Sequence, residues 1–119
     1  MQTKTSRKYD LEERLLEFAL GIIAVVEKLP DNKVCSHLGG QLLRSGTSPA
    51  LNYGEAQAAE SKKDFIHKLR IVLKELRETS VCLKILDRKS LLSNDSLVAE
   101  SGELIAIFSK SIVTAKANP

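Results

Sequence analysis

Basic side chains recur at helical spacing along residues 62–89. This stretch holds nine Lys and Arg against four Asp and Glu, although the whole chain has a net charge of only +3. Seven of its basic residues lie three, four or seven positions apart, and therefore share one face of a helix: Lys63, His67, Arg70, Lys74, Arg77, Lys84 and Arg88. We call this set the basic stripe. It is suited to bind the phosphates of a nucleic-acid backbone, and the alternative is an ordinary solvated helix face.

A set of polar residues precedes the stripe. Its members are three, four and three positions apart and share one helix face: Ser45, Ser48, Asn52 and Glu55. This face continues the line of Cys35, Leu38 and Leu42, so we expect it to point inward, where the amide and the carboxylate need partners. Arg70 or Arg77 could supply one. We interpret the set as a structural network that fixes helix register or subunit pairing; the alternative is a ligand-binding or catalytic pocket.

The sequence patterns typical of enzymes are missing. There is no Gly-rich phosphate-binding loop and no helical motif that pairs Glu with His. The two histidines, His37 and His67, are not at ligand spacing from another His or Cys. An enzyme would have to use Asn52 and Glu55, beside serines for which the sequence identifies no base. We therefore expect a protein that is not an enzyme and that uses no cofactor and no metal.

Cellular location is indicated by what the chain lacks. No apolar run approaches the roughly 18 residues of a membrane span, and the N-terminus has no apolar core of a signal peptide. Cys35 and Cys82 lie among apolar neighbours, where a thiol is typically a small buried hydrophobic group. We expect a cytoplasmic protein with no membrane partner.

The elements that position these residues are helices. The chain has 119 residues, is 43% hydrophobic and contains only 6 Gly and 3 Pro, a composition that favours one all-α domain. Its apolar residues recur at helical spacing in four stretches: about 10–29, 32–58, 61–88 and 93–116. The short connections between them predict an antiparallel up-down-up-down four-helix bundle that comprises residues 1–119.

Capping residues and one proline decide the expected helix ends. Side chains suited to cap the N-termini are Asp10, Asp31 or Asn32, Ser61, and Ser93 or Asn94. Pro49 falls inside the second helix, which either ends near Gly46 or continues with a kink to about Ala58. We favour the kinked helix, because Gly46, Ala50 and Gly54 form a strip of small residues that lets a neighbouring helix approach closely.

The third expected helix is more apolar than an isolated bundle requires. Its core line consists of Phe65, Leu69, Val72, Leu76, Leu83 and Leu86. A second line, formed by Ile71, Cys82 and Ile85, lies well round the helix from the first. Since one apolar stripe is enough for a bundle, the second line predicts a surface for a partner.

These residues together resemble a known bacterial family. The resemblance is carried by five segments: Arg44-Ser45-Gly46-Thr47-Ser48, Asn52, Glu55-Ala56, Ser61-Lys62-Lys63-Asp64-Phe65 and Lys74-Glu75-Leu76-Arg77-Glu78-Thr79. They look like segments of the bacterial four-helix-bundle proteins, also called 23S ribosomal RNA intervening-sequence proteins. The remaining helices agree with that family in length and order.

The resemblance implies an antiparallel four-helix bundle that assembles into a homo-oligomeric ring, with a pentamer as the expected form. Related accessory proteins of diversity-generating retroelements use a basic pentameric barrel to engage RNA and a reverse transcriptase. The resemblance therefore implies RNA, a reverse transcriptase or a ribosomal component as partners, besides further copies of the chain. Val81 and Cys82 depart from many relatives, which carry an aromatic pair before the residue equivalent to Leu83. The net charge of +3 is also lower than that of strongly basic retroelement accessories.

The leading hypothesis is a non-enzymatic homo-oligomeric bundle that binds RNA or a ribonucleoprotein through the basic stripe. The alternative is a structural or protein-scaffolding oligomer whose stripe is only solvated.

Overall fold

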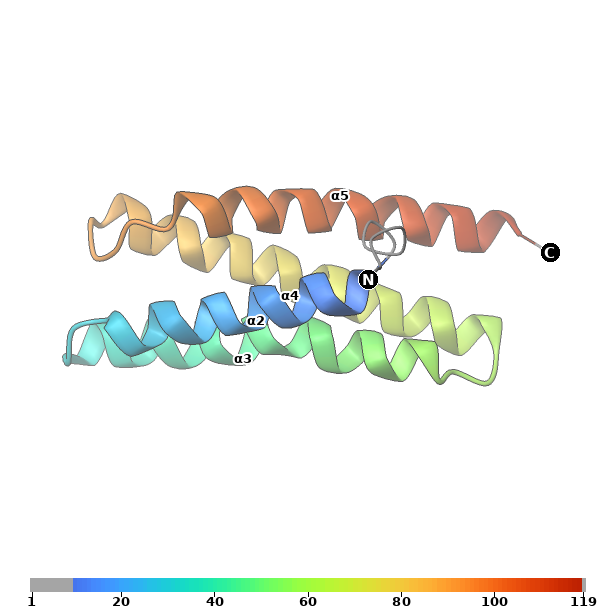
Figure 1. The fold of residues 1–119 in the computed structure, drawn as a ribbon, viewed down its shortest axis with the longest axis horizontal. Coiled ribbons are helices and arrows are strands. Elements are labelled where there is room, and N and C mark those ends of the chain that lie inside the picture. The colour runs from blue at the N-terminus through green and yellow to red at the C-terminus, as the bar shows by residue number, and fades with distance from the viewer. Residues whose placement is uncertain (1–9, 119) are drawn as a thin grey trace, which may run out of the picture.

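The computed structural model describes residues 10–118, which form four α-helices and no strand (Figure 1). The helices are α2 (Leu11–Lys28), α3 (Lys33–Gln57), α4 (Lys62–Arg88) and α5 (Asp95–Ala117). Each helix packs against the next one along the chain, whereas α2 and α5 touch only sparsely. The predicted all-α fold is confirmed, and the helix bounds differ from those expected by no more than two residues.

Three of the predicted N-caps are confirmed. Asp10 Oδ1 accepts a hydrogen bond from the backbone N–H of Glu13 at 3.0 Å. Asn32 Oδ1 accepts one from Cys35 at 2.8 Å, and Ser61 Oγ accepts one from Asp64 at 3.0 Å. Each bond satisfies a donor that the first helical turn would otherwise leave without a partner. The fourth helix differs, because the side chain of its N-cap residue, Asn94, makes no capping hydrogen bond.

The second helix runs through Pro49 without interruption. Proline has no N–H, so one helical hydrogen bond is lost at this point. Side chains on both sides of the proline bond to nearby carbonyls: Thr47 Oγ1 donates to Leu43 O at 2.8 Å, and Asn52 Nδ2 donates to Ser48 O at 3.1 Å. The expected continuation of the helix past Pro49 is confirmed, and the alternative end near Gly46 is wrong; the expected kink stays a prediction.

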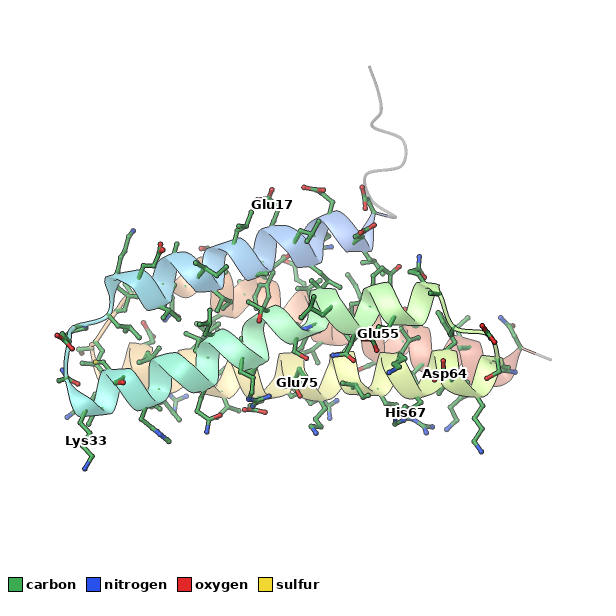
Figure 2. The ribbon with its side chains drawn as sticks, turned by 90° about the horizontal axis from the view of Figure 1, so that it is seen from below. Glu17, Lys33, Glu55, Asp64, His67 and Glu75 are labelled. Atoms are coloured by element: carbon green, nitrogen blue, oxygen red, sulfur yellow. The ribbon has the colours of Figure 1, made fainter. Side chains whose placement is uncertain are left out.

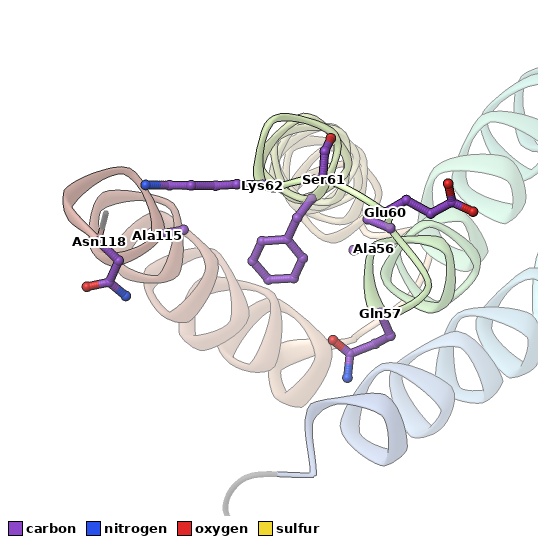
Figure 3. Close-up of a pocket in the computed structure, with 9 residues that line it drawn as sticks. Ala56, Gln57, Glu60, Ser61, Lys62, Ala115 and Asn118 are labelled. Carbon is purple, nitrogen blue, oxygen red and sulfur yellow. The ribbon is translucent and has the colours of Figure 1, made fainter.

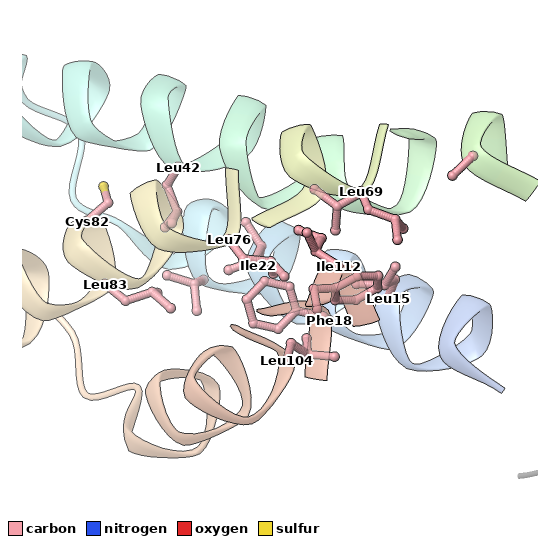
Figure 4. Close-up of a cluster of buried hydrophobic side chains, with 14 of the residues drawn as sticks. Leu15, Phe18, Ile22, Leu42, Leu69, Leu76, Cys82, Leu83, Leu104 and Ile112 are labelled. Atoms are coloured by element: carbon pink, nitrogen blue, oxygen red, sulfur yellow. The ribbon is translucent and has the colours of Figure 1, made fainter. Parts of the chain in front are cut away.

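The hydrophobic core is supplied unequally by the helices (Figure 4). Among its members are Leu15, Phe18 and Ile22 of α2, Leu42 of α3, Leu69, Leu76 and Leu83 of α4, and Leu104 and Ile112 of α5. Leu42 is the only large aliphatic side chain in the buried set of α3; the others are Cys35, Gly39, Ser45, Gly46, Pro49 and Ala56. The buried face of α3 therefore consists mostly of small side chains, which lets the neighbouring helices approach its backbone.

Gly46 marks a close approach between α2 and α3. A Cβ atom at this position would lie 2.7 Å from both Cγ1 and Cγ2 of Ile22, which is a β-branched side chain in the core. Gly54, by contrast, has no neighbouring atom within 4 Å of such a Cβ. The predicted strip of small residues is thus right for Gly46 and wrong for Gly54, which is exposed.

Gly46→Ala should destabilise the protein although alanine is the better helix former. The new methyl group would overpack against Ile22, at a cost of about 1–3 kcal/mol, which outweighs a gain in helix propensity of about 1 kcal/mol. Urea unfolding followed by circular dichroism at 222 nm measures the change. Gly40→Ala is the matched control: Gly40 is exposed in the same helix with open space around it, so this variant should be as stable as the wild type or more stable. Equal stability of the two variants would contradict the close approach.

Candidate nucleic-acid interface

Helix α4, labelled in Figure 1, places the whole basic stripe on the surface. The core line from Leu69 to Leu86 faces inward, and the stripe lies on the opposite side of the helix, with all seven residues exposed. Figure 2 shows His67 at the outer edge of the bundle, pointing away from the other helices. The stripe extends from Lys63 to Arg88, which at a rise of 1.5 Å per residue is a length of about 37 Å.

The charges of the stripe are not used inside the described chain. Within residues 10–118, none of the seven side chains forms an ion pair; the cations that do are Arg14, Arg44 and Lys68. An anionic ligand could therefore contact the stripe without breaking an ion pair of the fold.

Two aliphatic side chains interrupt the second half of the stripe. Val81 is 57% exposed and Ile85 is 47% exposed, among the cations Lys84 and Arg88. The first half, from Lys63 to Arg77, has no strongly exposed aliphatic side chain. The two halves of the stripe thus offer different chemistry.

The predicted second apolar line is wrong as a continuous surface. Cys82 is only 7% exposed and packs against α3, where its Sγ lies 3.7 Å from the carbonyl oxygen of Leu38. Ile71 is half-buried, so only Ile85 of this line is exposed. The reason is that α3 covers this side of α4, which the spacing within one helix does not reveal.

The predicted polar set forms three separate contacts instead of one network. Ser45 is buried, with Oγ 2.9 Å from Thr79 Oγ1 of α4. Ser48 stays within its own helix and accepts a hydrogen bond from Asn52 Nδ2 at 2.8 Å. The first three members of the set therefore make one buried contact between helices and one local contact.

Glu55, the last member of the set, is exposed and not buried as expected. Its Oε1 lies 2.7 Å from Lys68 Nζ. The expectation that Arg70 or Arg77 would serve as its partner is wrong, because both belong to the stripe on the outer side of α4.

An ion pair between an exposed arginine of α3 and a buried glutamate of α4 was missed in the sequence. Glu75 is buried in the flank of α4 that faces α3, and Arg44 Nη1 lies 3.1 Å from its Oε1. Arg44 also pairs with Glu78, one helical turn further along. Thr79 Oγ1 adds a hydrogen bond to the carbonyl oxygen of Glu75 at 2.8 Å. The sequence does contain a signal for this pair, because Glu75 is an acidic residue directly beside the core residue Leu76.

These contacts join the first and the last of the segments that carry the family resemblance. Arg44 and Ser45 come from the first segment, and their partners Glu75, Glu78 and Thr79 come from the last. Much of the resemblance therefore consists of residues that hold α3 against α4.

One hollow lies where the connection from α3 to α4 meets the end of α5 (Figure 3). It is lined by Ala56, Gln57, Ala59, Glu60, Ser61, Lys62, Phe65, Ala115 and Asn118. Its serine hydroxyl already accepts the capping bond of α4, and no His or Cys lines it. Across residues 10–118, no three His, Cys, Asp or Glu side chains are grouped so that they could hold a metal ion. The hollow shows no catalytic arrangement.

Comparison with known proteins identifies the family. The sequence model of the 23S rRNA-intervening sequence protein family matches residues 7–110. The chain belongs to this family. It is also similar to a solved protein of unknown function from the S23 ribosomal protein family of Bacteroides thetaiotaomicron VPI-5482, with 34% sequence identity and a TM-score of 0.78. That match covers 85% of this chain and 96% of the other.

No curated protein matches the chain significantly. The relation to retroelement accessory proteins stays a prediction. In the described part of the family member, no helix combines the length and apolar character that a membrane span requires.

Arg44→Leu should destabilise the family member by about 1–3 kcal/mol, because it leaves the buried carboxylate of Glu75 without its charge partner. Denaturant unfolding measures the loss. Lys68→Leu is the matched control, since it also removes a cation bound to a glutamate, but Glu55 is exposed and stays hydrated. If the control variant loses as much stability as Arg44→Leu, the burial of Glu75 is not the reason for the loss.

The thiol of Cys82 should react slowly in the folded protein. Burial, and to a smaller extent the charge of Glu78, raises the pKa of Cys82. A raised pKa leaves less of the reactive thiolate at a given pH, so modification at pH 8 should be at least roughly tenfold slower than in denaturant. Ellman's reagent measures the rate in a Cys35→Ala variant, which isolates this thiol. Equally fast reaction in both conditions would place Cys82 on the surface.

Proposed function

We propose that this protein is a non-enzymatic, homo-oligomeric member of the 23S rRNA-intervening sequence family that binds structured RNA, or a ribonucleoprotein, through the basic stripe. The observation that carries the proposal is a rigid helix with seven exposed basic residues, none of which is ion-paired within residues 10–118. The family, named for an insertion in 23S rRNA, supports RNA as the ligand.

The character of the stripe favours contacts with phosphates over contacts with bases. Six of its seven members carry their charges on the long side chains of Lys and Arg, along about 37 Å of helix, a length suited to several successive phosphates. None of them is Phe, Tyr or Trp, so beyond the small imidazole of His67 the stripe has no ring on which unpaired bases could stack. Phosphate contacts fix position but carry no sequence information, so recognition would depend on the shape of a folded RNA.

The connections between the helices support the up-down-up-down topology as part of the proposal. Residues 29–32, 58–61 and 89–94 separate helices of 18 residues or more. Four residues span at most about 14 Å and six about 21 Å, whereas even an 18-residue helix is about 27 Å long. Connections this short favour antiparallel neighbours.

Assembly into a ring, with five copies as the expected number, would make binding stronger than one copy allows. A net charge of +3 gives a single copy only a weak field. Several stripes on one rigid particle could engage the same RNA, and each contact after the first would be intramolecular.

Reversing three central charges of the stripe should weaken RNA binding. The variant Arg70→Glu/Lys74→Glu/Arg77→Glu should weaken binding to a folded 23S rRNA fragment at least tenfold and lower the salt slope by about three, because up to three phosphate contacts are lost. Fluorescence anisotropy over a salt series measures both quantities.

The matched control is Lys28→Glu/Lys110→Glu/Lys116→Glu, which changes the net charge equally but at exposed positions outside α4. It should retain most of the binding and the salt slope. No binding by the wild type at low salt, or equal losses in both variants, would contradict the proposed interface.

A structural or protein-scaffolding oligomer without RNA binding is the second candidate function. The exposure of Val81 and Ile85 favours it, because aliphatic side chains gain nothing from phosphates and are typical of protein contacts.

A further inference from the structure

Opposite charges lie on two helices that are not neighbours in the bundle. The exposed acidic residues of α2 are Glu12, Glu13, Glu17 and Glu27, whereas α4 carries the basic stripe. In the described chain, α2 packs on α3 and sparsely on α5, and no Cα atom of α2 lies within 8 Å of a Cα atom of α4. Glu17 and His67 accordingly lie at opposite edges of the bundle (Figure 2). Each molecule thus has an acidic side and a basic side.

The acidic side also exposes an aliphatic pair. Leu16 is 44% exposed and Leu20 is 59% exposed, and their spacing of four places them one turn apart on the same line of α2. Glu13 and Glu17 lie next to them on this surface. We call these four residues the acidic leucine patch.

The second half of the stripe also has an exposed aliphatic pair beside two like charges, but its charges are positive. Val81 and Ile85 are also four residues apart, and both are exposed. Lys84 and Arg88 lie beside them on the same face of α4. We call these four residues the basic aliphatic patch. Both patches therefore consist of two aliphatic side chains and two like charges within about two turns of helix.

We propose that the acidic leucine patch of one molecule binds the basic aliphatic patch of a second copy of this chain. Within one molecule the two patches lie on sides that face away from each other, so they can meet only between copies. A contact between two different surfaces is head-to-tail, and it continues from copy to copy until a ring closes.

The charges select this pairing over the alternatives. Two acidic leucine patches could bury their leucines against each other, but their four glutamates would repel, and the same holds for two basic patches. Between unlike patches the aliphatic pairs are removed from water while the surrounding charges attract. This inference rests on the proposed assembly but not on RNA binding, since the first half of the stripe, Lys63 to Arg77, stays outside the contact.

Charge reversal tests the pairing in the full chain. The variants Glu13→Lys/Glu17→Lys and Lys84→Glu/Arg88→Glu should each raise the dissociation constant of self-association at least tenfold, as measured by sedimentation velocity over a concentration series. The variant that combines all four substitutions should associate again, because the two charges have been exchanged. An equimolar mixture of the two double variants should also associate.

Two further variants control for charge and for folding. Lys110→Glu/Lys116→Glu makes the same change of charge as Lys84→Glu/Arg88→Glu, but on α5 and outside both patches, and should associate like the wild type. Leu20→Ser/Ile85→Ser should weaken association without reversing any charge. Circular dichroism confirms that each variant is folded.

The outcomes separate this inference from the proposed assembly. Roughly 100 μM is a dissociation constant typical of weak self-association. A wild type that is still monomeric at this concentration would overturn both the proposed assembly and the proposed pairing. Association that persists in the two double variants would overturn the pairing alone and leave the assembly standing on another surface. Loss of association without recovery in the fourfold variant would also overturn the pairing, because charge exchange would then not have restored it.

Discussion

The close approach of two helices to α3 is the constraint on which the rest of the structure depends. Gly46 leaves no room for a Cβ atom against Ile22, so α2 lies directly on the α3 backbone. On the other side, two small hydroxyl side chains, Ser45 and Thr79, meet at 2.9 Å and allow α4 to approach as well. These contacts fix the rotation of α4 about its own axis: Glu75 faces α3, the leucines face the core and the basic stripe faces outward.

The same contacts explain why the resemblance to the family is evidence for the fold and much weaker evidence for a binding function. The segments that carry the resemblance meet across the α3–α4 contact through Arg44, Glu75 and Glu78, and these residues are structural. Only three stripe residues, Lys63, Lys74 and Arg77, fall within those segments. A function in RNA binding must therefore be argued from the exposed charges themselves and not from membership of the family.

The sequence was sufficient wherever the deciding physics lies within one helix. Caps such as Asp10 and Ser61, the passage of α3 through Pro49, and the exposure of the stripe all follow from local hydrogen bonds and from the period of the α-helix. It was insufficient wherever a neighbouring helix decides. Cys82 is buried because α3 covers it, and Glu55 finds Lys68 because α3 and α4 meet in that register. Spacing along one helix contains neither fact.

The two halves of α4 present different surfaces, and this difference explains how a chain of modest net charge could bind both an RNA and a second copy of itself. At 27 residues, α4 is the longest of the four helices, about 40 Å, and so long enough to serve two partners. Its first half presents cations without exposed aliphatic residues, which suits a hydrated polyanion, whereas its second half mixes cations with Val81 and Ile85, which suits a protein surface. If the second half is covered by the acidic α2 of a neighbour, the charges that remain exposed on the assembly are those of the first half. Neutralisation between copies would then concentrate the positive potential on one band of the particle, although each chain carries a charge of only +3.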